Sequence, residues 1–353
     1  MSSQHRLHRL QSLLSQHGHE AYLVEQPLAL TYLTGLPLST GVLLVPAKGA
    51  GTLFVDGRYT QMARQQSIFE VADLDPKAWG PWCQERGIRK LGVSAEHTSL
   101  ARMEQITSQL AAASVTPYAL TDPMEELRII KDADEIDKLR RAGQLTLQGI
   151  QYASSLFQEG VSESELAVEL EVFWRRAGGE KLAFAPIIAF GANSAMPHYR
   201  AGAEILTMKD CVLLDVGVVV DGYHGDCTRF FTHPGCPSQL VIGAAAVEEA
   251  KAAAIAAIAP GVPLAELDRT AREVLRKHGL ETYFVHSLGH GIGLEIHEAP
   301  RIKYDHPQSK RLCAAGMVFT IEPGVYFPGI GGVRLEDTVL VTERGAEVLT
   351  ALS

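Results

Sequence analysis

Acidic residues in two predicted β-hairpins are the residues of this sequence best suited to chemistry. The segment CVLLDVGVVVDGYHGDCTRFF (211–231) has two strand-like runs around the Asp-Gly dipeptide at 221–222, a strong signal for a two-residue turn. With that turn, Gly217 opposes Asp226, and Asp215 lies diagonal to Asp226 on the same face, roughly 7–8 Å away. Two carboxylates aimed at one point repel each other unless a cation lies between them. For this hairpin alone, one buried, hydrogen-bonded aspartate beside one exposed aspartate is the alternative.

A second acidic pair follows in MVFTIEPGVYFPGIGGVRLEDTVLVT (317–342). A loop centred on Gly329 between its two strands puts Glu322 directly opposite Glu336 on one face. Glu322 follows an apolar run, where an unpaired charge would be costly to bury. Four carboxylates in one core need about two divalent cations, and a sulfur-free site suits hard or borderline metals such as manganese. Either pair alone is as often structural as functional, but both together favour a metal site.

Histidines in glycine-rich or turn-rich segments are candidate nitrogen ligands and substrate contacts. In HSLGHGIGLEIHEAP (286–300), three glycines disfavour a helix and let the backbone approach other groups closely. His290 is a candidate metal ligand, His297 is a candidate substrate contact, and His286 is equally well explained as a core residue. His198 in NSAMPHYR is the other imidazole in a turn-rich segment. The chain has no G-x-S-x-G, Walker or H-E-x-x-H motif, so serine hydrolase, nucleotide-binding and zincin functions lack support.

The elements that must position these residues fall into two predicted domains. The first, residues 1–122, alternates helical and strand patterns and has no evident chemical constellation of its own. A change of composition at 116–132, with two prolines and mixed charges, opens a long amphipathic helix, so we place the boundary near residue 122 and assign 123–353 to the second domain. In the first domain we expect a helix at 5–17, strands at 41–45, 51–55 and 90–96, and a helix at 100–113.

A weak internal repeat divides the second domain. EGVSESELAVELEVFWRRAGG (159–179) and PGVPLAELDRTAREVLRKHGL (260–280) superpose, and each is typical of a helix that ends at a glycine. Ser162 and Glu165 form a capping-box pattern in the first copy, and Pro263 lies near the start of the second. Chance similarity between two surface helices is one explanation. A duplicated domain with a site between its halves is the other, and it is supported by the strands that follow both helices.

The composition excludes several classes of protein. Of 353 residues, 46% are hydrophobic and 21% are charged, and the formal net charge of −9 gives no electrostatic reason to expect nucleic acid or an anionic membrane as a partner. Five cysteines without CxxC spacing argue against a disulfide scaffold or a zinc ribbon and fit a reducing cytoplasm. The first residues do not resemble a signal peptide, and no apolar run approaches the roughly 18 residues of a membrane span. We therefore expect a soluble, cytoplasmic protein.

The acidic and histidine motifs together resemble the pita-bread metallopeptidases, the family of methionine aminopeptidase, aminopeptidase P and prolidase. The motifs in question are LLDVGVVVDGYHGDCTR, GHGIGLEIHEAP, TIEPGVY and GVRLEDT, and the resemblance extends from about residue 125 to the end. YLTGL (32–36) and DGRYTQMA (56–63) resemble the amino-terminal domain of the Xaa-Pro branch. The resemblance implies an α/β protein of the α+β type, in which a small α/β domain precedes a pita-bread catalytic domain with an internal pseudo-twofold repeat.

The resemblance also implies a dinuclear metal site. Asp226 and Glu336 would bridge two divalent ions, Asp215 would hold one of them, and His290 with Glu322 would hold the other. Manganese is the preferred ion on ligand hardness and family resemblance, with cobalt or zinc as alternatives. All five ligands are present, which argues against relatives that keep the fold without the metals.

The catalytic roles are likewise implied by the resemblance. A water between the two ions would be the nucleophile, and Glu322 would move a proton from this water to the leaving nitrogen. His198, His297 and Arg334 match positions around the substrate, where the two histidines would donate hydrogen bonds to the oxyanion and the substrate carbonyl.

We expect a hydrolase that removes an N-terminal residue preceding proline from a peptide. The segment HSLGHGIGLEIHE and the short chain resemble microbial prolidases, which accept dipeptides. Tyr199 directly after His198 is more similar to aminopeptidase P, which accepts longer peptides, and on this feature we predict aminopeptidase P-like activity with Xaa-Pro dipeptidase as the alternative. A catalytically silent peptide-binding module and a hydrolase of another small amide are further alternatives. The resemblance also implies a homodimer.

Overall fold

The structure is a computed structural model that describes residues 3–351. The chain forms two compact units that divide between Arg128 and Ile129. The division falls within α6 (Pro123–Ile129), a short helix that starts directly after residue 122, where the sequence places the domain boundary.

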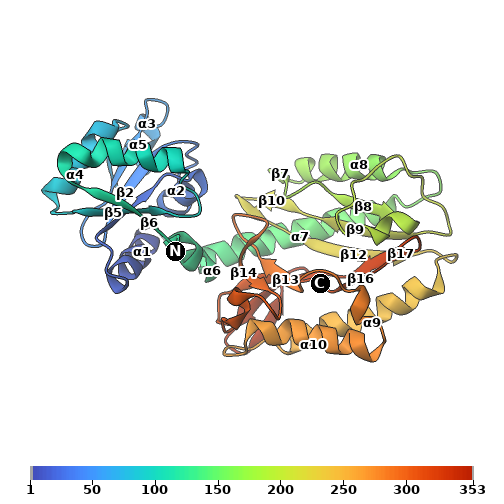
Figure 1. The fold of residues 1–353 in the computed structure, drawn as a ribbon. Helices are drawn as coiled ribbons and strands as arrows, with labels where there is room; N and C mark the ends of the chain where they lie inside the picture. The colour runs from blue at the N-terminus through green and yellow to red at the C-terminus, as the bar shows by residue number, and fades with distance from the viewer. Residues whose placement is uncertain (1–2, 352–353) are drawn as a thin grey trace. The chain divides into compact units, whose positions relative to one another are not determined.

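A mixed six-stranded sheet forms the centre of the N-terminal unit (Figure 1). The strand order is β4-β3-β2-β1-β5-β6, with β1 parallel to β5, β5 parallel to β6, and β2 antiparallel to both of its neighbours. Every residue of β1, β2 and β3 is buried, which indicates that both faces of the sheet are covered. The strands are β1 (Ala21–Val24), β2 (Val42–Pro46), β3 (Thr52–Val55), β4 (Glu70–Asp73), β5 (Lys90–Ser94) and β6 (Thr116–Leu120).

The helices of this unit agree with the spacing of apolar residues in the sequence. In α1 the leucines at helical spacing, Leu7, Leu10 and Leu14, are buried, as an amphipathic helix on a sheet requires. The helix expected at 100–113 is an α-helix to Leu110 and continues as a 3₁₀ turn. The helices are α1 (Ser3–Gln16), α2 (Pro27–Thr34), α3 (Thr60–Gln66), η1 (Pro76–Ala78), α4 (Trp79–Glu85), α5 (Leu100–Leu110) and η2 (Ala111–Ala113).

Two helices and two small antiparallel sheets make up the first half of the second unit. Strand β9 lies between β8 and β12 in one sheet, and β10 lies between β7 and β11 in the other. Both helices begin at capping boxes, Asp132 with Glu135 and Ser162 with Glu165, the second of which the sequence predicts. The elements are α7 (Ala133–Ser155), α8 (Glu163–Arg176), β7 (Lys181–Leu182), β8 (Ile187–Phe190), η3 (Gly191–Ala195), β9 (Cys211–Val216), β10 (Val218–Val220), β11 (Tyr223–His224) and β12 (Cys227–Thr232).

The second half follows the same plan, with two helices followed by strands. A five-stranded sheet has the order β14-β13-β15-β18-β19, and β16 pairs with β17 in a separate hairpin. Figure 1 shows α9 and α10 on one side of the strands and α8 on the other. The elements are α9 (Ser238–Ala256), α10 (Leu264–Lys277), η4 (Glu281–Tyr283), β13 (Gly289–Gly291), β14 (Glu298–Ile302), η5 (Pro307–Lys310), β15 (Val318–Ile321), β16 (Gly324–Phe327), β17 (Gly331–Arg334), β18 (Asp337–Thr342) and β19 (Gly345–Val348).

The two copies of the predicted repeat occupy equivalent places in the two halves. Helix α8 starts after Ser162 and α10 after Pro263, and each is followed by a glycine with positive φ, Gly178 (+96°) and Gly279 (+71°). Ser162 and Pro263 also each form an isolated antiparallel bridge to a later segment. Separate hydrophobic clusters lie against α8 and against α10. The structure therefore supports a duplicated domain over chance similarity.

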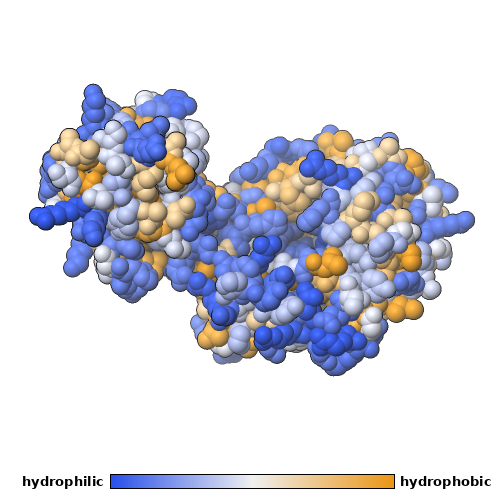
Figure 2. Space-filling model, in the orientation of Figure 1, coloured by the Kyte–Doolittle hydropathy of each residue, from blue (hydrophilic) through white to orange (hydrophobic). Residues whose placement is uncertain are grey.

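The face of the molecule in Figure 2 is predominantly polar. Hydrophilic residues cover most of the face shown in Figure 2, and hydrophobic residues occur on it in small groups. Scattered exposed apolar residues of this kind are normal for folded proteins and do not by themselves mark a binding surface. Within residues 3–351, no helix is long and apolar enough to cross a membrane.

Candidate metal centre

The first acidic hairpin has the register that its turn predicts. Asp221 and Gly222 both have positive φ, +49° and +79°, as a two-residue turn between twisted strands requires. Beyond the turn, β9 pairs with β12 so that Asp215 lies opposite Thr228, and β10 pairs with β11 in the same register. Asp226, which lies between β11 and β12, is therefore diagonal to Asp215, and both carboxylates belong to one face.

The second acidic hairpin also has the predicted register. Its loop contains Gly329 with φ +78°, and β16 pairs with β17 on either side of it. Farther from the loop, β15 pairs with β18 and brings Ile321 opposite Asp337. Because both ladders keep one register, Glu322 lies opposite Glu336 between them.

Among the residues that the structure describes, three of the five predicted metal ligands form one compact group. Asp226, His290 and Glu336 each offer a ligand atom, and these atoms all lie within 4.8 Å of one another. Nε2 of His290 is 3.5 Å from Oδ2 of Asp226 and 3.4 Å from Oε1 of Glu322, so Glu322 adjoins the same group. Asp215 raises the pKa of Asp226 by its charge, which places it beside them. The fold thus gathers all five side chains from both halves of the second unit.

The electrostatics of the group favour divalent cations. Burial, together with mutual repulsion, raises the pKa of Asp226 and of Glu336 well above the usual carboxyl range, and burial raises the pKa of Glu322 to about 8. Oδ1 of Asp226 is buried and has no hydrogen-bond partner within residues 3–351. A buried carboxylate oxygen that lacks a donor and belongs to a group of neighbouring carboxylates is suited to a cation. The residues therefore fit divalent metal ions.

His290 presents the correct nitrogen to this group. Its Nδ1 lies 3.1 Å from the carbonyl oxygen of Gly291, which can only accept, so Nδ1 holds the proton and donates. The pKa of His290 is lowered to about 3 by burial, and the imidazole is therefore neutral. Nε2, the nitrogen beside Asp226 and Glu322, keeps its lone pair for a metal ion.

Arg334 is buried and contacts a predicted metal ligand directly. Its side chain is buried, and its Nη2 donates to Oδ2 of Asp215. Nη1 donates to the hydroxyl of Tyr326 at 2.7 Å, and Nε donates to Oγ1 of Thr228 at 3.3 Å. Arg334, which the sequence assigns to the substrate region, thus also neutralises and orients a predicted metal ligand.

The other three histidines considered in the sequence analysis, His198, His286 and His297, border the group in different ways. The ring of His297 lies edge to face against that of His290, with centroids 4.3 Å apart. His198 lies exposed in the loop after η3, and its charge lowers the pKa of both His286 and His297, which places it near them. His286 accepts from the Tyr326 hydroxyl through Nε2 (2.9 Å) while its Nδ1 donates to the oxygen of Ser287 (2.8 Å). His286 is therefore connected to Arg334 through the Tyr326 hydroxyl.

Two further residues that the sequence analysis did not single out support the site. Oγ1 of the fully buried Thr228 donates to Oε2 of Glu336 at 2.6 Å. Its position in β12, two residues after Asp226, is the signal that could have identified it. The Tyr326 hydroxyl accepts from Arg334 and donates to His286, and nothing in its sequence context distinguishes it from a core tyrosine.

Glu163 organises the loop that contains His198. Its carboxylate is fully buried and accepts four hydrogen bonds, all from residues 190–202. No local sequence pattern predicts them, because these donors lie 27 to 39 residues after Glu163 in the chain. The donors are the backbone N–H of Phe190 (2.8 Å), Nδ2 of Asn193 (3.0 Å), the Tyr199 hydroxyl (2.8 Å) and the backbone N–H of Gly202 (3.0 Å).

Comparison with known families agrees with this geometry. A model of metallopeptidase family M24 matches residues 137–343, the part of the chain that contains all five predicted ligands. This chain belongs to metallopeptidase family M24. A model of the creatinase/prolidase N-terminal domain matches residues 6–130 of this M24 peptidase. The predicted fold class is thereby confirmed: a small α/β domain precedes a pita-bread catalytic domain, and the protein is a metallo-exopeptidase.

Individual relatives cover nearly the whole M24 peptidase. An Xaa-Pro dipeptidase of Pyrococcus furiosus is 35% identical over 349 residues, 98% of this chain and 97% of the relative. The solved structure of an Xaa-Pro dipeptidase from Bacillus anthracis has a TM-score of 0.94 at 31% identity and covers 100% of this chain and 98% of its own. An X-Pro aminopeptidase from Thermotoga maritima has a TM-score of 0.87 at 30% identity, over 95% and 96% of the two chains.

Proposed function

We propose that this metallo-exopeptidase is an Xaa-Pro dipeptidase, which hydrolyses the bond between the first residue and proline in a dipeptide. The observation that supports it most directly is the complete five-residue ligand group in a chain that matches Xaa-Pro dipeptidases over nearly its whole length. The relatives favour this dipeptidase alternative over the aminopeptidase P-like activity that the sequence analysis preferred.

Tyr199, the residue on which the prediction of aminopeptidase P-like activity depends, has a structural role. Tyr199, which suggested aminopeptidase P, donates its hydroxyl to Glu163 at 2.8 Å, and its ring packs against Ile187 and Leu213. The side chain thus stabilises the loop around His198, so its identity is weak evidence about the length of the substrate.

Five side chains would hold two divalent ions in this proposal. Asp226 and Glu336 would bridge both ions, Asp215 would hold one, and His290 and Glu322 would hold the other. When bound, such a pair of ions lowers the pKa of a coordinated water and polarises the scissile carbonyl. Hard carboxylate oxygens with one imidazole suit manganese, and cobalt and zinc are the alternatives.

The other roles belong to side chains around the ligand group. Glu322, whose Oε1 lies 3.4 Å from Nε2 of His290, would accept the proton of the nucleophilic water and pass it to the proline nitrogen. His297, against the ring of His290, and His198, in the exposed loop, would donate hydrogen bonds to the substrate carbonyl and the developing oxyanion. Arg334 would hold Asp215 in place. We further propose a cytoplasmic homodimer; the five free thiols fit a reducing compartment.

A comparison of peptide lengths tests the proposal. Metal-free protein is loaded with manganese, cobalt or zinc and assayed on Ala-Pro, Ala-Pro-Ala and, as a control without proline, Ala-Ala. We expect turnover of Ala-Pro and at least a hundredfold lower kcat/KM on the other two peptides. No turnover of any Xaa-Pro peptide with any of the three metals would contradict the assignment to Xaa-Pro peptidases, and turnover of creatine instead would indicate a hydrolase of another amide.

Xaa-Pro aminopeptidase activity is the second candidate function. The similarity to the Thermotoga maritima X-Pro aminopeptidase over nearly the whole chain supports it. Faster cleavage of Ala-Pro-Ala than of Ala-Pro in the same assay would favour this candidate, and the roles proposed for the metal ligands would remain the same.

A further inference from the structure

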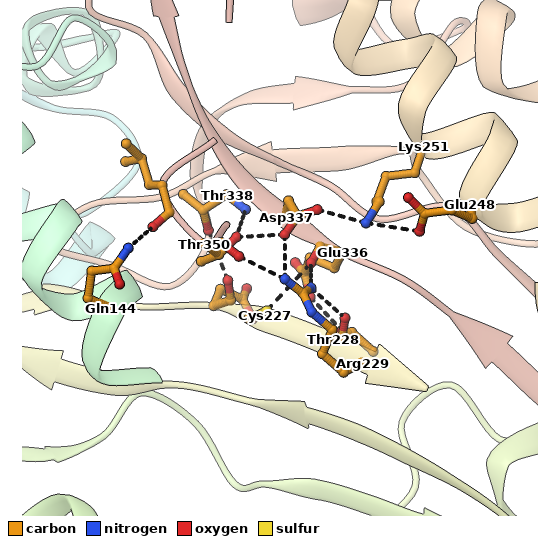
Figure 3. Close-up of polar contacts among 12 residues, drawn as sticks. Gln144, Cys227, Thr228, Arg229, Glu248, Lys251, Glu336, Asp337, Thr338 and Thr350 are labelled. Atoms are coloured by element: carbon orange, nitrogen blue, oxygen red, sulfur yellow. Dashed lines mark hydrogen bonds and ion pairs between the residues drawn. The ribbon is translucent and has the colours of Figure 1, made fainter. Parts of the chain in front are cut away.

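A polar network surrounds Arg229 and Asp337 beside Glu336, one of the two carboxylates proposed to bridge the metal ions (Figure 3). At its centre, Nη1 of Arg229 donates to the backbone oxygens of Glu336 (2.6 Å) and Thr228 (3.0 Å). Nη2 of the same guanidinium donates to Oδ1 of Asp337 (2.8 Å) and to the backbone oxygen of Thr350 (2.7 Å). One planar group thus connects β12 in the first half, residues 336–337 in the second half and the C-terminal segment.

Asp337 holds this guanidinium in place. Its side chain is only 8% exposed, and while Oδ1 accepts from Arg229, Oδ2 pairs with Nζ of Lys251 in α9 at 2.8 Å. Oγ1 of Thr350 donates to Oδ1 as well, at 2.9 Å. A buried carboxylate between two cations and a hydroxyl has little freedom to move, because any displacement would leave a buried charge without its partner.

The C-terminal segment reaches the other bridging residue through Thr338. Oγ1 of the fully buried Thr350 accepts from the backbone N–H of Thr338 at 3.0 Å. The hydroxyl of Thr338 donates to the backbone oxygen of Asp226 at 2.9 Å. The backbone of Leu349 adds a hydrogen bond from its N–H to the oxygen of Thr338. Thr350 is therefore connected to Glu336 through Arg229 and to Asp226 through Thr338.

We propose that Arg229 and Thr350 are positioning residues that set the separation of Asp226 and Glu336, and so the affinity for two divalent cations. This inference rests on the bridging roles in the proposed function. The two carboxylates come from different halves of the domain and repel each other, so neither hairpin alone determines the distance between them. The network ties their backbones together without touching the cation site, and supports of this kind typically change metal affinity by about 10–100-fold.

Cobalt(II) titration of chelator-treated protein, followed by the visible absorption of bound cobalt, tests the role of Arg229. Arg229→Lys keeps the positive charge. A lysine ammonium, however, cannot donate to the four acceptors that the two terminal nitrogens of the guanidinium reach together. We expect affinity for the second equivalent of cobalt to fall at least tenfold and the absorption bands to shift. Arg140→Lys is the matched control, because Arg140 pairs with Glu347 through 2.7 and 2.8 Å contacts that involve no metal ligand. Its titration should match that of the parent.

Thr350 provides a second and milder test. Thr350→Val keeps the shape and removes the hydroxyl, and we expect cobalt affinity to fall about tenfold. Thr350→Ser keeps the hydroxyl, and we expect affinity and spectrum close to those of the parent. A merely structural role would lower the thermal stability of the Val variant in chelator while its cobalt affinity and spectrum stayed unchanged.

The outcomes separate this inference from the proposed function. Parental affinity and spectrum in both Arg229→Lys and Thr350→Val would overturn the positioning role. If Arg229→Lys does not fold, the comparison of Thr350→Val with Thr350→Ser tests the proposal instead. Identical cobalt binding by these two variants would overturn the positioning role. Asp226→Ala, titrated in parallel, tests the bridging role itself: if it still bound two cobalt ions tightly, the proposed ligand assignment would be wrong whatever the other variants did.

Discussion

Arg334 and Asp215 form a buried ion pair across the two halves of the catalytic domain, since Arg334 lies in β17 and Asp215 in β9. The pair continues into a directed chain of hydrogen bonds, in which Arg334 donates to Tyr326, Tyr326 donates to His286, and His286 donates to the backbone of Ser287. The pKa of His286 is lowered to about 4, chiefly by burial, so this imidazole is neutral and can accept. A proposed metal ligand is thus oriented by residues that are not themselves proposed metal ligands.

Removal of the Tyr326 hydroxyl should weaken this orientation. In Tyr326→Phe, Arg334 and His286 each lose a buried partner, and we expect the free energy of unfolding to fall by about 2 kcal/mol. We expect kcat/KM on Ala-Pro to fall about tenfold, with two metal ions still bound. Tyr118→Phe is the matched control, because Tyr118 also pairs with a histidine, His19 (2.8 Å), in the N-terminal unit. Unchanged kcat/KM in Tyr326→Phe would contradict the orienting role.

Loss of a bridging carboxylate should remove metal. We expect Asp226→Ala and Glu336→Ala each to bind fewer than two ions per chain and to lose nearly all activity, because each side chain is proposed to bridge both ions. Elemental analysis after gel filtration measures the number of metal ions bound per chain. Glu347→Ala, which removes a carboxylate paired with Arg140 at the surface, should keep both ions. Two ions per chain in either bridging variant would disprove the assignment.

The metal-free protein should lose stability as the pH rises above neutrality. The pKa of Glu322 is raised to about 8, and those of Asp226 and Glu336 are also raised well above the usual carboxyl range, so the native state binds more protons than the unfolded state, in which glutamate has its ordinary value near 4.5. The free energy of unfolding therefore falls with increasing pH until the folded pKa is passed. The lowered pKa values of His286 and His290 act in the opposite direction only below about pH 6.5, where unfolded histidine titrates.

Thermal unfolding in chelator between pH 6.5 and 8.5 measures this effect. We expect Tm to decrease across that window for the metal-free protein and to change much less after manganese is added, because the cations compensate the carboxylate charges. In Glu322→Gln the decrease should be smaller, since one titrating group is absent. A Tm that stays constant in chelator would show that the buried carboxylates do not titrate as their environment indicates.

Glu163 should control catalysis through the His198 loop. In Glu163→Gln one carboxylate oxygen becomes an amide NH₂ that faces donors, so the loop loses at least one of its four hydrogen bonds. We expect kcat/KM on Ala-Pro to fall about tenfold while two metal ions stay bound. Glu169→Gln is the matched control on the same helix, because Glu169 also accepts from a tyrosine, Tyr152 (2.9 Å), but at the surface. Equal activity of the two variants would exclude a role for Glu163 in positioning His198.

The sequence alone determined the local geometry of the site. An Asp-Gly turn at 221–222 and a loop centred on Gly329 set the registers of two hairpins, and the alternation of strand side chains then assigned each acidic pair to one face. The capping box at Ser162 and Glu165 likewise depends on neighbouring residues only. These features were predictable because backbone sterics and hydrogen bonds within a few residues govern them.

Only the tertiary structure decided how the two hairpins meet and what surrounds them. The ion pair of Arg334 with Asp215, the hydrogen bond from Arg229 to Thr350 and the hydrogen bond from Tyr199 to Glu163 all join segments far apart in the chain. No local pattern specifies such contacts, because they depend on the packing of one half of the domain against the other. For this reason the sequence pattern links Tyr199 to substrate length, whereas in the structure its hydroxyl donates to Glu163 and stabilises the loop that contains His198.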